Sequence, residues 1–137
     1  MQYVITAGSE LPIYRQLMRQ IIDAIASGHL QPGDKLTSQR ELAEQLVIAP
    51  LTVKKAYDEL EREGLIRTER GRGTFVAATA QPLDPESQRE RLRDPARQLL
   101  SRALLSDLSF EELVELLREL HTELVDERTT SNESDDD

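Results

Sequence analysis

The sequence predicts a mostly α-helical fold with one small β-hairpin, in which a winged helix-turn-helix precedes a C-terminal hairpin of two helices. Three observations lead to this prediction. Apolar residues recur at helical spacing after Pro12, and two helix-start signals lie close together at Ser38 and Pro50. An arginine- and glycine-rich loop at residues 69–73 separates two short runs of β-forming residues. Beyond residue 84, charged residues and regularly spaced leucines replace this pattern.

An extended segment, residues 1–11, precedes a first helix that is expected to begin at Pro12. Proline suits the first helical position because its missing N–H would have no partner there. Ser27-Gly28 marks the helix end, where glycine is common. Residues 35–37 could form a short strand. The apolar stripe of the helix consists of Ile13, Leu17, Ile21 and Ile25.

The helix-turn-helix is predicted between Ser38 and Gly64. Ser38 opens a Ser-x-x-Glu capping box, in which its hydroxyl accepts a hydrogen bond from the backbone N–H of Glu41. Residues 47–49 form the turn, and Pro50 starts the third helix, which Gly64 ends. Two strands, at residues 65–68 and 74–76, then form the hairpin, or wing.

The net charge of −9 is unevenly distributed along the 137 residues. Residues 1–77 carry ten Lys/Arg and ten Asp/Glu, whereas residues 78–137 carry seven and sixteen. Because the local field decides whether phosphates are attracted, the acidic C-terminal part does not argue against nucleic-acid binding by the front part.

Composition argues against several other classes of protein. The sequence has no cysteine, no apolar run of about 20 residues that could span a membrane, and no signal peptide, so a cytoplasmic location is expected. It has no glycine-rich phosphate loop and no nucleophile beside an evident base. His29 and His121 lack neighbours at metal-ligand spacing. We therefore expect no enzyme activity, no cofactor and no metal site.

The start of the third helix carries the first candidate contacts with DNA. A major groove admits an α-helix, whose N-terminal residues reach the base edges. Thr52 could donate to a base or phosphate, Lys55 could pair with a phosphate or guanine, and Leu51 could touch a thymine methyl group. The alternative is that these residues form an ordinary solvated helix face. The candidates here are Leu51, Thr52, Lys54 and Lys55.

Arginines supply the second group of candidates. Arg40, in the first turn of the second helix, could clamp guanine or phosphate, or instead pair with Glu44 four residues later. Arg70 and Arg72 lie on the wing, where Gly71 and Gly73 permit close backbone approach. Such arginines can follow phosphates or enter a minor groove. Ser38 has its capping role in any case, and a phosphate contact would be additional.

The C-terminal leucines need a partner surface. A hairpin of about 35 residues is too small to bury two apolar faces by itself. A four-helix bundle formed by two chains would bury them, although the hairpin could instead fold back on its own winged helix. Residues 78–84 are interpreted as a linker, 85–128 as the dimerisation region and 129–137 as a disordered acidic tail. One helix is expected to start at Asp94-Pro95 with Asp94 as its N-cap, the charged segment before it being less clear, and Ser109 and Glu112 form another capping box at the start of the next helix. The expected dimerisation residues are Leu99, Leu100, Leu104, Leu113, Leu117, Leu120 and Leu124.

With these motifs in place, the sequence resembles the GntR family of bacterial transcription regulators. The matching segments, within residues 12–77, are PIYRQL, PGDKL, SQRELAEQL, TVKKAYDELEREGLI and GRGTFV. The short leucine-rich tail resembles the YtrA subfamily, which lacks a large effector domain. The resemblance implies a homodimeric repressor, often of a transporter operon, that binds palindromic operators commonly bracketed by GT and AC. It also implies DNA contacts at Arg40, at the start of the third helix, and along the wing from Arg70 through Gly73 to Thr74.

Four positions depart from the family pattern. Proline is common where Thr37 stands, a change that affects local stiffness only. Glycine is usual where Val47 stands, so the turn could be shaped differently. A polar cap is usual at Ala49, and its loss could cost the third helix roughly 1 kcal/mol. Leu51 replaces a residue that is typically polar or basic, which leaves the base preference open.

The sequence therefore predicts a cytoplasmic, homodimeric repressor of palindromic double-stranded DNA, without indicating an effector or the regulated genes. The alternative hypothesis keeps the fold but makes the chain a protein-interaction adaptor, whose working surface is the acidic, leucine-rich tail.

Overall fold

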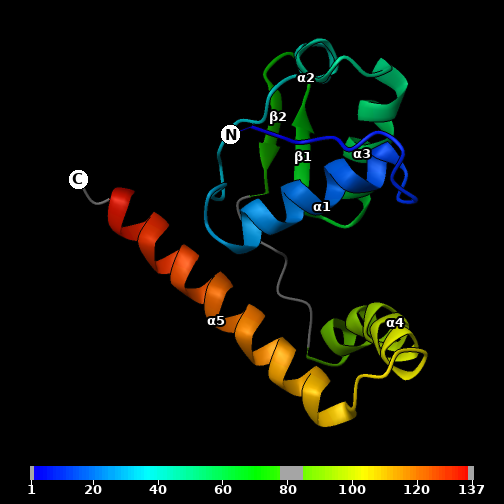
Figure 1. Ribbon diagram of the computed structural model, residues 1–137. Helices are drawn as coiled ribbons and strands as arrows, with labels where there is room; N and C mark the ends of the chain where they lie inside the picture. Colours follow the sequence, from blue (N-terminus) through cyan, green and yellow to red (C-terminus); the bar gives the residue numbers. More distant parts are fainter. Residues whose placement is uncertain (1, 78–84, 136–137) are drawn as a thin grey trace.

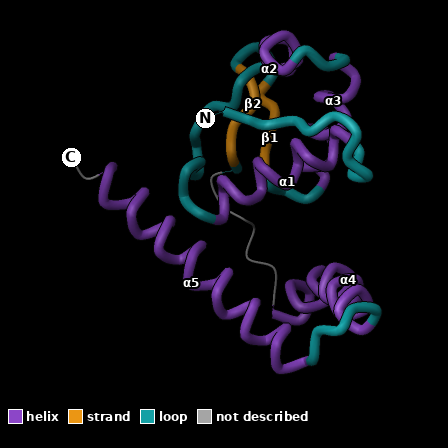
Figure 2. Tube along the Cα trace, in the orientation of Figure 1, coloured by secondary structure: helices purple, strands orange, loops and turns teal. Residues whose placement is uncertain are grey.

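The computed structural model describes residues 2–77 and 85–135 and has five helices and a two-stranded antiparallel sheet in these ranges (Figure 1). The elements form two parts, a compact N-terminal unit and a pair of C-terminal helices (Figure 2). The N-terminal unit contains α1 (Ile13–Ala26), α2 (Gln39–Leu46), α3 (Pro50–Arg62), β1 (Ile66–Glu69) and β2 (Gly73–Val76). The C-terminal part, here called the tail, contains α4 (Pro85–Leu104) and α5 (Phe110–Asp135).

Helix α3 is the centre of the N-terminal unit. It packs against α1, α2 and β1. Its buried face repeats at helical spacing, and three of these side chains, Val53, Ala56 and Leu60, have no exposed surface. Leu17 and Ile21 of α1 are equally buried, as predicted from the apolar stripe. This core holds one face of α3, and the opposite face of the helix is therefore exposed to solvent.

Two glutamines hold the extended N-terminal segment against α1. The Gln16 side-chain amide donates to the backbone oxygens of Thr6 and Leu11, and its oxygen accepts from the Thr6 N–H at 2.8 Å. Gln20 makes the same two-way exchange with the backbone of Val4. These amides replace the partners that a neighbouring β-strand would offer. Helix α1 begins at Ile13, with Pro12 at the N-cap, and ends before Gly28 with its positive φ of 82°.

The hairpin has the predicted position, with Ile66 opposite Val76 and Glu69 opposite Gly73. The expected strand at residues 35–37 is reduced to one bridge, between Lys35 and Phe75. Residues 33–36 nevertheless run beside β2, since the N–H of Leu36 donates to the Thr74 oxygen at 2.8 Å. The wing is therefore anchored along both edges of β2.

Helix α4 differs from the prediction at its start. It runs without interruption from Pro85, with Pro95 inside it, so Asp94 is not its N-cap. The Pro95 ring removes one backbone hydrogen bond, but the Glu, Gln, Arg and Leu residues before it favour a helix enough for the helix to continue. The linker predicted at residues 78–84 lies outside the described residues.

Helix α5 also extends further than expected. Its N-cap is the predicted Ser109, which accepts from the Glu112 N–H at 3.1 Å. The helix continues to Asp135 through residues expected to be disordered from 129 onward, which corrects that prediction for residues 129–135. Once a helix has nucleated, each further residue adds a backbone hydrogen bond. The hydroxyls of Thr129 and Thr130 also bond back to the carbonyl oxygens four residues earlier.

The leucine faces of the C-terminal helices remain largely open. Leu113 is 5% exposed, but Leu117 and Leu120 are 44% and 45% exposed. None of the residues of the core cluster comes from α4 or α5. In this single chain most of the leucine surface of α4 and α5 is therefore uncovered, although Leu99 lines a cavity that α4 shares with α1 and α3. The other strongly exposed apolar side chains of the tail are Leu92, Leu104, Leu105 and Phe110.

Candidate nucleic-acid interface

The entry to α2 is built as the sequence predicts. Ser38 is the N-cap, and its hydroxyl accepts from the Glu41 N–H at 3.2 Å. Thr37, the residue before Ser38, is held by α3, because the Tyr57 hydroxyl donates to the backbone carbonyl oxygen of Thr37 at 2.6 Å. Burial, with the neighbouring Tyr3, raises the pKa of the Tyr57 phenol well above its ordinary value. The hydrogen bond from Tyr57 thus connects the start of α2 to α3.

The turn between α2 and α3 passes through a left-handed residue. Val47 has φ 54° and ψ 51°, a conformation that branched side chains rarely adopt. Its side chain is 89% exposed, so little packing offsets the strain. The turn keeps the conformation that glycine would adopt without cost. Val47 is therefore strained, in a backbone conformation that suits glycine better than a branched residue.

The first turn of α3 is open at its outer face. Ala49, at the N-cap, makes no side-chain cap bond, and Pro50 occupies the first helical position. Leu51 is 76% exposed, whereas Thr52 is partly buried. The predicted contacts at the start of this helix are therefore on the surface, but they differ in how freely their side chains can reach outward.

The two lysines of this helix have partners within the chain. The Lys54 ammonium lies 2.6 Å from a carboxylate oxygen of Asp58, one helical turn later. The Lys55 ammonium lies 4.2 Å from the centre of the Tyr14 ring on α1, a cation–π arrangement. Both side chains are exposed, and exposed ion pairs contribute little energy. Either lysine could exchange its partner for a phosphate.

Arg40 is exposed in the first turn of α2. The ion pair that could have competed for it, with Glu44, is not among the salt bridges of the described residues. Its guanidinium is consequently free to act as a donor toward an external group.

The tip of the wing carries Arg70 and Arg72, both exposed. Gly71 and Gly73 between and after them have positive φ values, 81° and 127°, which only glycine adopts readily. The backbone here closes a tight turn, with the Arg72 N–H donating to the Glu69 oxygen at 2.9 Å. The two guanidiniums are thereby held on a short, rigid loop next to the helix-turn-helix.

Thr74 requires a correction. It was expected among the DNA contacts, but it is only 7% exposed, so its side chain is not available to a large ligand. Side chains alternate along a strand, and Thr74 shares the inward face of β2 with the buried Val76. The alternation was visible in the sequence and would have excluded it.

Lys35 is a basic residue of this surface that the sequence reasoning missed. It is exposed and pairs with Phe75 across the bridge. Its side chain crosses the wing so closely that a Cβ placed on Gly73 would lie 2.8 Å from its Cε. Only the pairing of residues 33–36 with β2 brings it there, so no local sequence signal could have found it.

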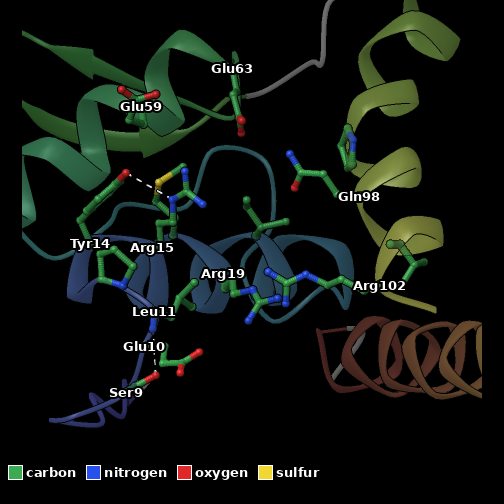
Figure 3. Close-up of a pocket in the computed structure, with 15 residues that line it drawn as sticks. Ser9, Glu10, Leu11, Tyr14, Arg15, Arg19, Glu59, Glu63, Gln98 and Arg102 are labelled. Carbon is green, nitrogen blue, oxygen red and sulfur yellow. Dashed lines mark hydrogen bonds between the residues drawn. The ribbon is translucent and has the colours of Figure 1, made fainter. Parts of the chain in front are cut away.

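A separate cavity of about 1100 Å³ lies between α1, α3 and α4. Arg19 of α1 and Arg102 of α4 extend toward each other across it, while Glu59 and Glu63 line its α3 side (Figure 3). Its lining mixes both signs of charge, in contrast to the cationic wing. The N-terminal unit and the tail meet at this cavity, and the Arg91 guanidinium also donates a long hydrogen bond, 3.5 Å, to the backbone carbonyl oxygen of Glu63.

These features together define the class of protein. Two helices joined by a tight turn, with the first turn of the second helix exposed and a cationic hairpin beside it, form a winged helix-turn-helix of the kind that binds DNA. Residues 13–76 match the family described as bacterial regulatory proteins, gntR family. The chain is also 39% identical over 116 residues to the HTH-type transcriptional repressor YtrA of Bacillus subtilis (strain 168), covering 85% of this chain and 89% of that protein. The chain belongs to the GntR family of DNA-binding transcriptional regulators, and to its YtrA subfamily.

Solved structures extend the comparison. A structure described as a transcriptional antiterminator from Listeria monocytogenes EGD-e matches with a TM-score of 0.80 and 32% identity, covering 91% of this chain and 93% of that one. The DNA-binding domain of AraR in complex with operator ORX1 matches with a TM-score of 0.50 and 30% identity, covering 56% of this chain and 96% of that one. The first likeness includes the tail, and the second concerns the N-terminal unit. The relatives are regulators and not enzymes.

No helix in residues 2–77 and 85–135 is long and apolar enough to cross a membrane. In the same ranges, no three or more His, Cys, Asp and Glu side chains are grouped so that they could hold a metal ion. His29 instead forms a 2.6 Å hydrogen bond with the Ser27 hydroxyl.

Proposed function

We propose that the protein is a cytoplasmic, homodimeric repressor that binds a palindromic operator in double-stranded DNA. The observation that carries the proposal is the exposed start of α3, in a unit that also exposes the guanidinium of Arg40 on the packed helix α2 and those of Arg70 and Arg72 on the wing. Helix and wing can then contact adjacent grooves and phosphates of one half-site. The operator complex of the related AraR domain supports this mode of binding.

The contacts that we propose differ in role. Arg40 is placed to donate two hydrogen bonds to a guanine or a phosphate. Lys54, Lys55 and Thr52 contact the backbone or base edges from α3, once the lysines leave their intramolecular partners. Arg70 and Arg72 follow the phosphates, with Gly73 allowing close approach. Lys35 adds a positive charge beside the wing.

Dimerisation follows from the tail. Leu117, Leu120 and Leu124 are 44%, 45% and 37% exposed along one helix, a pattern that a second copy of the chain would cover. A two-fold axis through such a bundle sets two recognition helices about one DNA turn, or a multiple of it, apart. This is why the operator is expected to be palindromic.

The first experiment is the selection of fragmented genomic DNA of the source organism on the purified protein. It is done at about 150 mM salt, where non-specific phosphate binding is weak. We expect a few fragments that share a palindrome. Their positions would also test the further expectation, which comes from the family resemblance, that the regulated genes form a transporter-type operon.

Recovery of no DNA, or of bulk DNA without a shared sequence, would contradict the proposal. That result would favour the adaptor function, since a protein-interaction surface needs no sequence preference. The exposed leucines of α4 and α5 are the observation on which that second function would depend.

The wing can be tested separately through the salt dependence of binding. If Arg72 contacts a phosphate, Arg72→Ala should weaken binding broadly and lower the slope of log affinity against log salt by about 1. Arg118→Ala, on α5, is the matched control and should leave the slope unchanged. Equal slopes for the Arg72 variant and the natural chain would remove Arg72 from this role.

A further inference from the structure

The leading end of the recognition helix is apolar. Ala49, Pro50 and Leu51, here called the apolar tip, are consecutive and exposed, and Leu51 is 76% exposed. Ala49 makes no side-chain cap bond, and none of the three side chains carries a hydrogen-bond donor or acceptor. A helix that enters the major groove by its N-terminal end would place this tip against the base edges first.

The base edges offer few matching surfaces to such a tip. In the major groove, guanine, adenine and cytosine present hydrogen-bonding groups, whereas thymine also presents its 5-methyl group. An apolar side chain pressed on a donor or acceptor displaces water without replacing its hydrogen bond, which is unfavourable. Pressed on a methyl group, the same side chain buries apolar surface on both partners, which is favourable.

We propose that Leu51 reads the 5-methyl group of a pyrimidine in each half-site of the operator. The inference rests on the proposed function and adds to it one determinant of sequence. The charges of the same unit fit a duplex as the occupant, because Arg40 is exposed on α2, which packs against α3, and the wing arginines are exposed cations that can hold the phosphates. In this proposal Arg40 and Thr52 recognise bases through hydrogen bonds, and Leu51 recognises the methyl group through apolar contact.

The free fold does not require a leucine at this position. Val53, two residues later, is fully buried and supports the core, whereas Leu51 points away from it. Leu51→Ala should therefore leave the unfolding midpoint unchanged. This separation makes the residue suitable for a binding test that is not confounded by misfolding.

The test uses the operator recovered by the genomic selection. Each dT of one half-site is replaced in turn by dU, which removes only the 5-methyl group. At one position we expect affinity to fall about fourfold, the factor given by burial of one methyl-sized group. Leu51→Ala should bind the dT and dU operators equally. Replacing dT at that position with 5-methyl-dC should likewise give tighter binding than replacing it with dC.

Val4→Ala provides the matched control, because Val4 is also strongly exposed, at 71%, but lies in the N-terminal segment. It should keep the full difference between dT and dU. The inference is overturned if no dT position responds to dU, or if Leu51→Ala responds as strongly as the natural chain. Either result leaves sequence-specific binding, and hence the proposed function, intact. Failure to recover any shared operator would instead remove the proposed function itself.

Discussion

The backbone conformation of Val47 is unfavourable for a residue with a branched side chain. Its φ of 54° is the left-handed conformation, in which a Cβ approaches the following carbonyl oxygen. Val47→Gly should therefore stabilise the fold by roughly 0.5–1 kcal/mol, the strain relieved less the extra entropy of glycine in the unfolded chain. Denaturant unfolding measures this. Val47→Ala retains a Cβ and should gain less, and equal gains for the two variants would contradict the explanation.

Tyr57 connects stability to pH. Burial, then the neighbouring Tyr3, raises the pKa of its phenol above the ordinary value of 10.0. Below that value the phenol is neutral in both folded and unfolded chains, and its stabilising contribution is complete. As pH rises above about 10, only the unfolded chain ionises readily, so the contribution is progressively lost.

Tyr57→Phe tests this linkage. At neutral pH it should cost about 1 kcal/mol, because the Thr37 carbonyl loses its donor. Above pH 10 its stability should fall less steeply than that of the natural chain. Urea unfolding between pH 7 and pH 11 compares the two. Parallel pH profiles would show that Tyr57 does not cause the alkaline loss.

The extended N-terminal segment is held in place by hydrogen bonds from two glutamine side chains of α1. Gln16 is 9% exposed and satisfies three backbone groups of residues 6 and 11. Gln16→Ala leaves those groups without partners and should destabilise the protein by about 1–3 kcal/mol. Gln20→Ala, whose bonds to Val4 are exposed, should cost less. Thermal unfolding ranks the two variants, and a larger effect at Gln20 would contradict the role of burial.

The elements of the N-terminal unit could be predicted because their signals are local. Ser38, Pro50 and Gly64 each define a helix end through residues within one turn. Apart from Thr74, whose burial follows from the local alternation along its strand, the errors arose where distant or cooperative interactions determine the structure. Lys35 reaches the wing only through pairing with β2, and α4 and α5 continue past Pro95 and Thr129 because an established helix propagates at little cost. What covers the exposed leucines of α4 and α5 cannot be predicted from the sequence of one chain, because it is decided by contacts outside that chain.

At the scale of the whole molecule, the tail should control assembly. A glutamate in place of Leu117 or Leu120 would place a charge inside the proposed bundle, which is unfavourable without a partner. We expect Leu120→Glu to shift sedimentation from dimer to monomer and to weaken binding to the palindrome far more than to an isolated half-site. His121→Glu adds the same charge one residue away, outside the stripe, and should remain dimeric. An unaltered dimer for Leu120→Glu would exclude this leucine face as the interface.

The uneven charge of the chain has a consequence for how the protein finds its site. Any random stretch of chromosome can attract the arginines of the wing, and such stretches greatly outnumber operators. Residues 78–137 carry sixteen carboxylates against seven cations, and this net negative charge repels the same duplex. Encounters that depend on phosphates alone should therefore be brief, and only a fitting sequence should hold the protein longer. If the chain binds an operator as proposed, we expect the excess of carboxylates beyond residue 77 to shorten its stay on non-operator DNA.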